Sequence, residues 1–163
     1  MPEKYRVRLD KEYHVFCAAH FITFDGKICE PLHGHNYRVA VEVDGPLDEN
    51  QYVVDFIALR DALKAITDDL EHHMLLPLEH PTIHVRSEQQ EVEVRFEDRR
   101  WVFPRSECAL LPMPNTTAEL LARYIGKRLL DDVEKRTGTR PERIQVSVDE
   151  SNGQWGICEL IDE

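Results

Sequence analysis

The sequence predicts an α+β protein built on an antiparallel sheet, and three observations support this prediction. Several stretches alternate apolar and polar residues with a period of two, which is typical of strands with one buried face. Two longer stretches repeat apolar residues every three or four positions, which is typical of helices that pack on a sheet. Strands and helices are not interleaved one by one, and this order favours an antiparallel α+β sheet over a doubly wound parallel one.

The first third of the chain predicts strands. Residues 5–9 alternate apolar and charged side chains, and residues 12–22 form a longer extended stretch. Residues 36–44 alternate most clearly, with tyrosine and valine on one side and charged residues on the other. A loop over residues 23–33, which contains glycine and proline, separates the last two stretches.

Two helices and two further strands follow. Asp55 is placed to cap a helix over residues 56–70, and Thr116 and Glu119 have the spacing of a capping box at the start of a second helix, which ends near Gly138. Residues 144–148 and 155–161 predict the last strands. Between the helices, residues 82–86, 91–96 and 101–103 predict an inserted hairpin or three-stranded excursion. The order is β-β-α-(hairpin)-α-β-β.

Length and charge limit the classes of function. A chain of 163 residues predicts a single domain over 1–163. The formal charge is 20 − 31 = −11, which argues against nucleic-acid binding, because that binding depends on lysine and arginine neutralising phosphates. The amino-terminal residues lack the apolar core of a signal peptide, and no apolar run approaches a membrane span. Four scattered cysteines then predict free thiols in a reducing cytoplasm.

The densest functional signal lies between Cys29 and His35. In an extended chain His33 and His35 project to the same face, and Gly34 leaves no side chain between them. His20 ends the preceding strand and reaches the same point if the two strands are neighbours. Three imidazoles leave one position of a tetrahedral Zn²⁺ open, as in catalytic zinc sites. Copper, iron and nickel also suit imidazole, so zinc is inferred from the ligand type.

Two further groups are candidates for proton transfer. Cys29 near a cation is expected to have a lowered thiol pKa, although a buried cysteine also serves as a small apolar residue. Glu71 precedes His72 at the end of the first helix, and a carboxylate beside a histidine can orient the ring. A helix end is also an ordinary place for histidine.

These residues, taken in order, resemble the 6-pyruvoyl-tetrahydropterin synthase and 6-carboxytetrahydropterin synthase family. The matching motifs are Phe16-Cys17-Ala18-Ala19-His20, Cys29-x-x-x-His33-Gly34-His35-Asn36-Tyr37, Val54-Asp55-Phe56, Leu70-Glu71-His72-His73, Thr117-Ala118-Glu119 and Asp149-Glu150-Ser151. The resemblance implies a T-fold, which is a four-stranded antiparallel sheet with two helices on one face (β-β-α-α-β-β). It further implies that three subunits close a barrel, that two trimers commonly stack, and that active sites lie between subunits.

The resemblance also assigns roles to individual residues. His20, His33 and His35 match the zinc ligands, and Cys29 matches the catalytic thiol. His72, with Glu71 before it, matches a proton-relay pair supplied by a neighbouring subunit. Glu150 matches the carboxylate that binds the pterin edge, where two parallel N–H bonds would give orientation as well as affinity. Thr117 and Glu119 match positions that support this pocket.

The implied enzyme is a lyase acting on 7,8-dihydroneopterin triphosphate, and its product stays open. The spacing Cys-x-x-x-His-Gly-His favours 6-carboxy-5,6,7,8-tetrahydropterin, on the deazaguanine (queuosine) route. A family subgroup with glutamate at the position of Glu30 releases 6-hydroxymethyl-dihydropterin for folate synthesis, and this chain has both Cys29 and Glu30. Glu30 as a solvated loop residue is an equal alternative. Triphosphate elimination to 6-pyruvoyl-tetrahydropterin is a third outcome.

The chain departs from the family pattern in three places, and two of them, Glu71 and the long insertion, are the best support for an alternative from another class, a non-catalytic zinc- or pterin-binding protein. Glu71 stands where the family usually has aspartate, and the extra methylene shifts the carboxylate by about an ångström, which can cost on the order of 10²-fold in rate. Leu76 stands where asparagine often occurs. Residues 78–113 are much longer than the equivalent family loop and hold the inserted hairpin.

Overall fold

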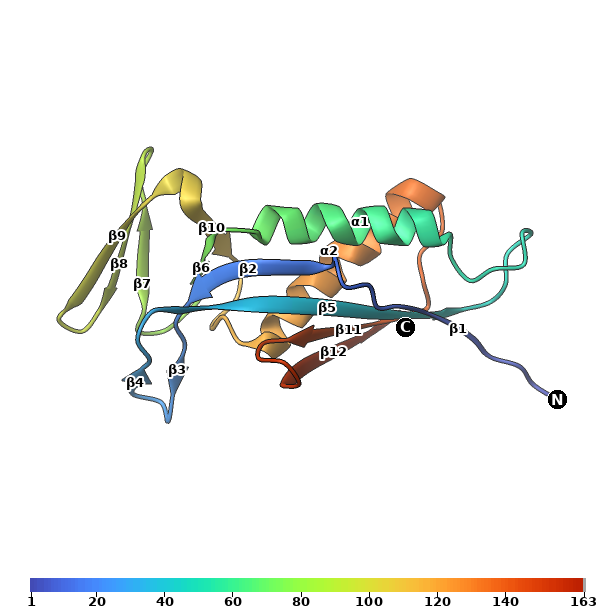
Figure 1. Ribbon diagram of the computed structural model, residues 1–163, viewed down its shortest axis with the longest axis horizontal. Helices are drawn as coiled ribbons and strands as arrows, with labels where there is room; N and C mark the ends of the chain where they lie inside the picture. Colours follow the sequence, from blue (N-terminus) through green and yellow to red (C-terminus); the bar gives the residue numbers. More distant parts are fainter. Residues whose placement is uncertain (163) are drawn as a thin grey trace. The chain divides into compact units, whose positions relative to one another are not determined.

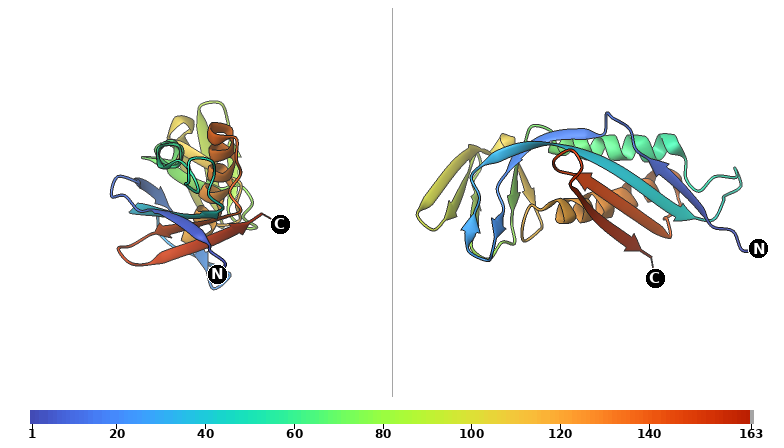
Figure 2. Two further views of the ribbon diagram at one scale, coloured as in Figure 1. Left: turned by 90° about the vertical axis from the view of Figure 1, so that its right-hand side faces the viewer. Right: turned by 60° about the horizontal axis from the view of Figure 1, so that its bottom comes forward.

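The computed structural model describes residues 1–162, which form two compact units. The first unit comprises residues 1–15, 37–68 and 118–162, and the second comprises residues 16–36 and 69–117. Figure 1 and Figure 2 show the elements of the chain. Within residues 1–162, no helix combines the length and apolar character that crossing a bilayer requires.

The first unit contains antiparallel strands joined in the order β1, β5, β11 and β12. These strands span Tyr5–Leu9, His33–Gly45, Arg143–Asp149 and Trp155–Ile161, although the first residues of β5 belong to the second unit. The register places valine opposite apolar partners, such as Val41 opposite Val146 and Val43 opposite Ile144. These side chains are almost fully buried, and each contributes roughly 1.5–3 kcal/mol by burial.

Two helices cover one face of this sheet (Figure 1). Helix α1 spans Phe56–Leu70, and the Asp55 carboxylate accepts a hydrogen bond from the Ile57 N–H at 2.8 Å, as the predicted cap requires. Helix α2 spans Ala118–Thr137 and packs on β11 and β12. The chain leaves α2 at Gly138, whose φ of +74° lies in the left-handed region that glycine tolerates.

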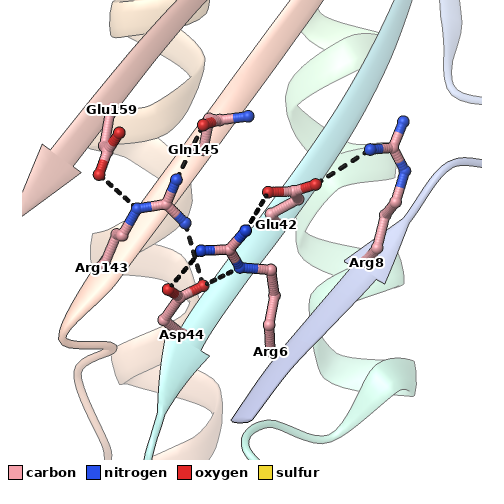
Figure 3. A network of polar contacts seen from close by, with 7 residues as sticks. All are labelled: Arg6, Arg8, Glu42, Asp44, Arg143, Gln145 and Glu159. Atoms are coloured by element: carbon pink, nitrogen blue, oxygen red, sulfur yellow. Dashed lines mark hydrogen bonds and ion pairs between the residues drawn. The ribbon is translucent and has the colours of Figure 1, made fainter. Parts of the chain in front are cut away.

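The opposite face of the same sheet holds a network of charged side chains (Figure 3). Arg6 on β1 donates two hydrogen bonds to the Asp44 carboxylate on β5, at 2.7 and 2.8 Å. Arg143 on β11 donates to Asp44 at 3.0 Å and also contacts Glu159 on β12. The Arg6 hydrogen bonds hold the pKa of Asp44 below its usual value. The network therefore pairs opposite charges across four strands.

The second unit is built from short strands. Strands β2 (Val15–His20), β6 (Met74–Pro77) and β10 (Cys108–Leu111) are joined in parallel pairs. A small hairpin of β3 (Thr23–Phe24) and β4 (Ile28–Cys29) lies between β2 and β5 in the sequence.

The inserted segment of the second unit forms a three-stranded antiparallel sheet, as predicted. Its strands are β7 (His84–Ser87), β8 (Glu91–Phe96) and β9 (Arg99–Pro104), followed by a short 3₁₀ turn over Arg105–Glu107. Buried residues of this sheet share an apolar cluster with the remainder of the unit. The cluster contains Phe21, Cys29, Met74, Leu76, Ile83, Val92, Val94, Phe96 and Cys108.

The α+β class and the two helices are confirmed, and the expected purely antiparallel sheet is corrected. Four antiparallel strands occur in the first unit, but β6 and β10 add parallel pairs, so the sheets are mixed. Strand β6 is buried at all four positions and so shows no alternation that sequence analysis could detect. Helix α2 begins at Ala118, two residues after the predicted cap at Thr116. A single domain over 1–163 stays a prediction.

Candidate metal centre and active site

Three histidines of the second unit converge on one point. His20 ends β2, while His33 and His35 occupy alternate positions at the start of β5, which lies next to β2. One nitrogen of each ring lies within 4.8 Å of those of the other two. The ring centroids are 4.7 to 5.2 Å apart, and the rings meet edge-on at 69° to 88°. Rings in contact at these angles present nitrogens to a common centre rather than stacking face to face.

Backbone carbonyls hold two of these rings. The Nδ1 of His20 lies 2.9 Å from the Thr116 carbonyl oxygen, and the Nδ1 of His33 lies 2.8 Å from the Pro31 carbonyl oxygen. A ring that donates from Nδ1 to a carbonyl keeps the lone pair on Nε2, the atom that then faces a metal. Burial lowers the pKa of His20 to about 4, so the ring is neutral at neutral pH, the form that binds metal.

The donor set fits a metal ion. Three converging imidazoles, two of them oriented by backbone carbonyls, are a ligand set suited to zinc, and three protein ligands leave a coordination position for a substrate oxygen. Gly34 allows the close approach of β5 to β2, because a Cβ there would lie 3.2 Å from the Ala18 carbonyl oxygen. Glycine at position 34, between the two candidate ligands, is therefore also favoured by the packing of β5 on β2.

The Glu30 carboxylate faces the histidines. Its Oε1 lies 3.6 Å from the Nε2 of His33 and 3.9 Å from the Nε2 of His20. The same oxygen accepts a hydrogen bond from the Ile22 N–H at 2.8 Å, and the side chain is 24% exposed. These contacts hold the carboxylate beside the candidate metal ligands, where a proton acceptor would be useful.

The Cys29 side chain is directed into the apolar cluster of the second unit. The residue is 5% exposed, and burial raises the pKa of its thiol, partly offset by the Arg99 charge. The lowered thiol pKa expected beside a bound cation stays a prediction. Neighbouring residues in an extended chain face opposite sides, so the arrangement that turns Glu30 toward the histidines turns Cys29 away.

Glu71 and His72 form the expected pair. The His72 Nε2 lies 2.9 Å from one Glu71 carboxylate oxygen, while the other accepts the Cys17 N–H at 2.7 Å. His72 has a φ of +56° after the end of α1, and its N–H donates to the Cys17 carbonyl at 2.7 Å. The carboxylate is thereby fixed by backbone, while the ring, 77% exposed, is free to meet a substrate.

His72 also lines a pocket of about 370 Å³ in the second unit. The wall of this pocket contains apolar side chains of Leu32, Met74 and Phe103 together with Gly34 and His72. Pockets for small molecules combine an apolar lining with a few polar groups, and this pocket has a volume in their usual range.

Comparison with known proteins decides the family. A model of the 6-pyruvoyl tetrahydropterin synthase family matches residues 8–160. A protein of Methanocaldococcus jannaschii with the provisional name 6-carboxy-5,6,7,8-tetrahydropterin synthase is 32% identical over 144 residues, which cover 88% of this chain and 87% of that relative. The 6-carboxy-5,6,7,8-tetrahydropterin synthase of Haemophilus influenzae is 30% identical, with 77% of this chain and 83% of that enzyme covered.

The chain belongs to the 6-pyruvoyl tetrahydropterin synthase family. A solved structure of the Plasmodium falciparum 6-pyruvoyl tetrahydropterin synthase superposes with a TM-score of 0.90 at 28% identity, covering 99% of this chain and all of that one. The fold therefore matches the T-fold of that family. Members of the family are lyases, so this protein is a lyase that acts on a pterin.

The remaining residues assigned by the family resemblance lie outside the histidine cluster. Thr117 immediately precedes α2, Glu119 lies in its first turn, and Glu150 follows β11. The buried Asp149 carboxylate accepts the N–H groups of residues 151, 153 and 154, and so shapes the turn that carries Glu150. Glu119 and Glu150 belong to the first unit and the three histidines to the second.

Three contacts that support the candidate site were not predicted from the sequence. Thr116 was assigned to a capping box, but it is fully buried, and its carbonyl and hydroxyl both contact the His20 ring. Pro31 contributes a carbonyl, which no side-chain motif can reveal. Arg99, from the insertion, contacts the Cys29 carbonyl. The alternation of Cys29 and Glu30 is the one signal in the sequence that could have shown which of them faces the histidines.

Proposed function

We propose that this protein is a zinc-dependent lyase that converts 7,8-dihydroneopterin triphosphate into 6-carboxy-5,6,7,8-tetrahydropterin. The observation that supports the proposal most strongly is the convergence of His20, His33 and His35 within 4.8 Å of one another. The names of relatives that cover more than three quarters of the chain point to the same product. A non-catalytic binding protein is not supported, because the family model and the relatives carry the names of synthases.

His20, His33 and His35 would hold the zinc ion. When bound, the ion would supply Lewis acidity to a side-chain oxygen of the substrate, which makes hydrogens on the adjacent carbons easier to remove. Glu150 would accept N–H bonds from the pterin edge and fix its orientation, with Thr117 and Glu119 supporting that pocket. Glu30 or Cys29 would take the first proton, and His72, oriented by Glu71, would handle the second.

A second product is favoured by one specific observation. Glu30 presents its carboxylate to the histidines, whereas Cys29 is buried among apolar side chains. If Glu30 is the general base, the enzyme releases glycolaldehyde triphosphate and 6-hydroxymethyl-dihydropterin. Both candidates break the bond between the first and second side-chain carbons. They differ in whether triphosphate is eliminated, and therefore in the two-carbon fragment: acetaldehyde with free triphosphate, or glycolaldehyde that still carries the triphosphate.

Product identification tests both candidates. Zinc-loaded protein is incubated with 7,8-dihydroneopterin triphosphate, and the pterin and aldehyde are identified by mass spectrometry. Acetaldehyde and triphosphate with 6-carboxytetrahydropterin support the proposal, whereas glycolaldehyde triphosphate with 6-hydroxymethyl-dihydropterin supports the second candidate. Triphosphate without any aldehyde indicates 6-pyruvoyl-tetrahydropterin instead. Complete absence of turnover by metal-loaded protein contradicts the proposal.

Two matched variants assign the base. Glu30→Ala and Cys29→Ala change adjacent residues with opposite orientations, and both remove one functional group. Loss of product in Glu30→Ala with activity retained in Cys29→Ala identifies Glu30 as the base, and the reverse identifies the thiol. An unchanged product ratio in both variants contradicts the idea that the two residues support different cleavages.

We further propose that the protein assembles as a trimer or a dimer of trimers in the cytoplasm. Strand β12 is the last strand of its sheet among the described residues, and it exposes Trp155, Ile157 and Ile161 by 38%, 53% and 64%. Exposed apolar side chains on an edge strand favour pairing with another chain. The expected mass by light scattering is three or six times 19.1 kDa, and Ile157→Lys is expected to lower it. A monomeric wild type would contradict this assembly.

A further inference from the structure

Arg99 connects the inserted sheet to the segment that carries Glu30. It is the first residue of β9, and both terminal nitrogens of its guanidinium group lie 3.3 Å from the Cys29 carbonyl oxygen. The two residues are 70 positions apart in the sequence. A planar guanidinium with both amino groups on one oxygen restrains that oxygen in position and in direction.

Aromatic side chains hold the Arg99 guanidinium in place. Its central carbon lies 5.1 Å from the ring centre of Phe96 and 5.7 Å from that of Trp101. The Trp101 ring is in turn stacked on Phe21, with centroids 4.6 Å apart and planes at 25°. Phe21 directly follows the ligand His20 in the sequence. Arg99 is therefore restrained by two aromatic rings, and the hydrogen bonds to Cys29 require little additional ordering of its side chain.

The peptide that Arg99 restrains is the one that carries Glu30. The Cys29 carbonyl is one end of this peptide group, and its other end, the Glu30 N–H, donates to the Ile22 carbonyl at 3.0 Å. The Glu30 carboxylate then folds back to accept the Ile22 N–H at 2.8 Å, with the histidine nitrogens within 4 Å. Both ends of the peptide are thus fixed, one of them by the insertion.

We propose that Arg99 is a positioning residue of the active site, which holds the Cys29–Glu30 peptide so that the Glu30 carboxylate stays directed at the three histidines. The inserted sheet, through Arg99, then restrains the segment that carries Glu30. This inference rests on the proposed function only for its effect on turnover, since the restraint itself is a property of the fold. Arg99 acts through the peptide and not on the substrate, so its loss lowers kcat more than it raises KM.

Arg100, the next residue in the sequence, provides a matched control. Arg100 is exposed on the same strand, and its guanidinium donates to Glu93 of β8 at 2.8 Å, away from Cys29. Arg99→Gln and Arg100→Gln remove the same charge from the same strand, and only the first removes the contact with the Cys29 carbonyl. Arg99→Lys keeps the charge and loses the planar fork.

Two measurements are made on each zinc-loaded variant. Steady-state kinetics with 7,8-dihydroneopterin triphosphate give kcat and KM, and amide hydrogen exchange reports on the Ile22 and Glu30 N–H groups. We expect Arg99→Gln to lower kcat by about 10- to 100-fold with KM within about threefold, because misplacement of a catalytic group by an ångström has effects of this size. The two amides exchange about 10-fold faster, Arg99→Lys is intermediate, and Arg100→Gln matches wild type.

Exchange in the inserted sheet distinguishes positioning from loss of the fold. If the amides of β8 and β9 stay protected in Arg99→Gln while those of Ile22 and Glu30 exchange faster, the restraint is confirmed. General loss of protection in the insertion, unchanged exchange at Ile22 and Glu30, or a kcat equal to that of Arg100→Gln in an active enzyme would overturn the proposal. A wild type without pterin turnover defeats the proposed function, and exchange alone then decides the role of Arg99.

Discussion

Two clusters of polar side chains, one in each unit, show how differently neighbouring strands can arrange such groups. In the first unit, Arg6 and Arg143 lie against Asp44, and every charged group drawn in Figure 3 meets one of opposite sign. In the second unit, three rings of the same kind aim their nitrogens at one point. Complementary pairs of opposite charge stabilise the fold, whereas converging imidazoles are an arrangement suited to binding a metal ion.

The two clusters also differ in what their loss should cost. Ion pairs on a partly exposed sheet face are worth about 0–1 kcal/mol each, because water and salt screen them. A set of metal ligands supports the catalysed reaction itself, and its loss is expected to remove several kcal/mol of transition-state stabilisation. Four substitutions test this difference, from the largest expected effect to the smallest.

Removing a ligand should have the largest effect. His35→Ala is expected to lose bound zinc and to reduce kcat/KM by roughly 10³-fold or more, because Lewis acid stabilisation of several kcal/mol disappears. Metal content by mass spectrometry and steady-state kinetics check both parts. His84→Ala, which changes a histidine of the inserted sheet, serves as the control. A His35→Ala protein that retains stoichiometric zinc would contradict the assignment of the centre.

Loss of the Glu71 charge should affect turnover without affecting metal. Glu71→Gln retains the shape but weakens the interaction that orients the His72 ring at 2.9 Å, and kcat is expected to fall by about 10- to 100-fold. Metal content and the free energy of unfolding should stay close to wild type. The exposed Glu88→Gln on the inserted segment is the control. Equal activity of the two variants would mean that the Glu71–His72 pair takes no part in the reaction.

A methyl group at Gly34 should disturb the centre by geometry alone. The added Cβ would lie 3.2 Å from the Ala18 carbonyl oxygen, so β5 must move away from β2 and carry His33 and His35 with it. We expect about a 10-fold weaker zinc affinity in Gly34→Ala, measured by chelator competition. Gly45→Ala in the same strand is the matched control, since its Cβ would meet only a Val53 methyl at 3.5 Å. Identical affinities would show that the centre tolerates strand movement.

The smallest effect is expected in the ion-pair network. Asp44→Asn should lower the free energy of unfolding by about 1 kcal/mol at neutral pH, as judged by urea denaturation. Because Arg6 depresses the pKa of Asp44, the contribution of this carboxylate is present above its unfolded value of 3.8 and is lost as the pH falls through the folded value. The difference between wild type and variant should therefore shrink below about pH 4 and also at high salt. A difference that persists in acid would point to packing instead.

The features that the sequence predicts correctly are those that depend on local interactions. The alternation of β5, the cap at Asp55 and the spacing of His33 and His35 each depend on a few consecutive residues, and the structure reproduces them. The parallel pairing of β6 with β10 was not predicted. The paired residues are more than thirty positions apart in the sequence, and β6 is fully buried and so shows no alternation. Contacts such as Arg99 with Cys29 depend on tertiary packing, which no local pattern encodes.

The order in which the site can be completed during synthesis follows from the link between His20 and Thr116. The two residues are 96 positions apart, and the carbonyl that fixes the His20 tautomer belongs to the later one. On the ribosome, His33 and His35 emerge soon after His20, but Thr116 emerges 96 residues after His20. A nascent chain therefore lacks the fully oriented ligand set until Thr116 has emerged, and tight metal binding has to follow that step.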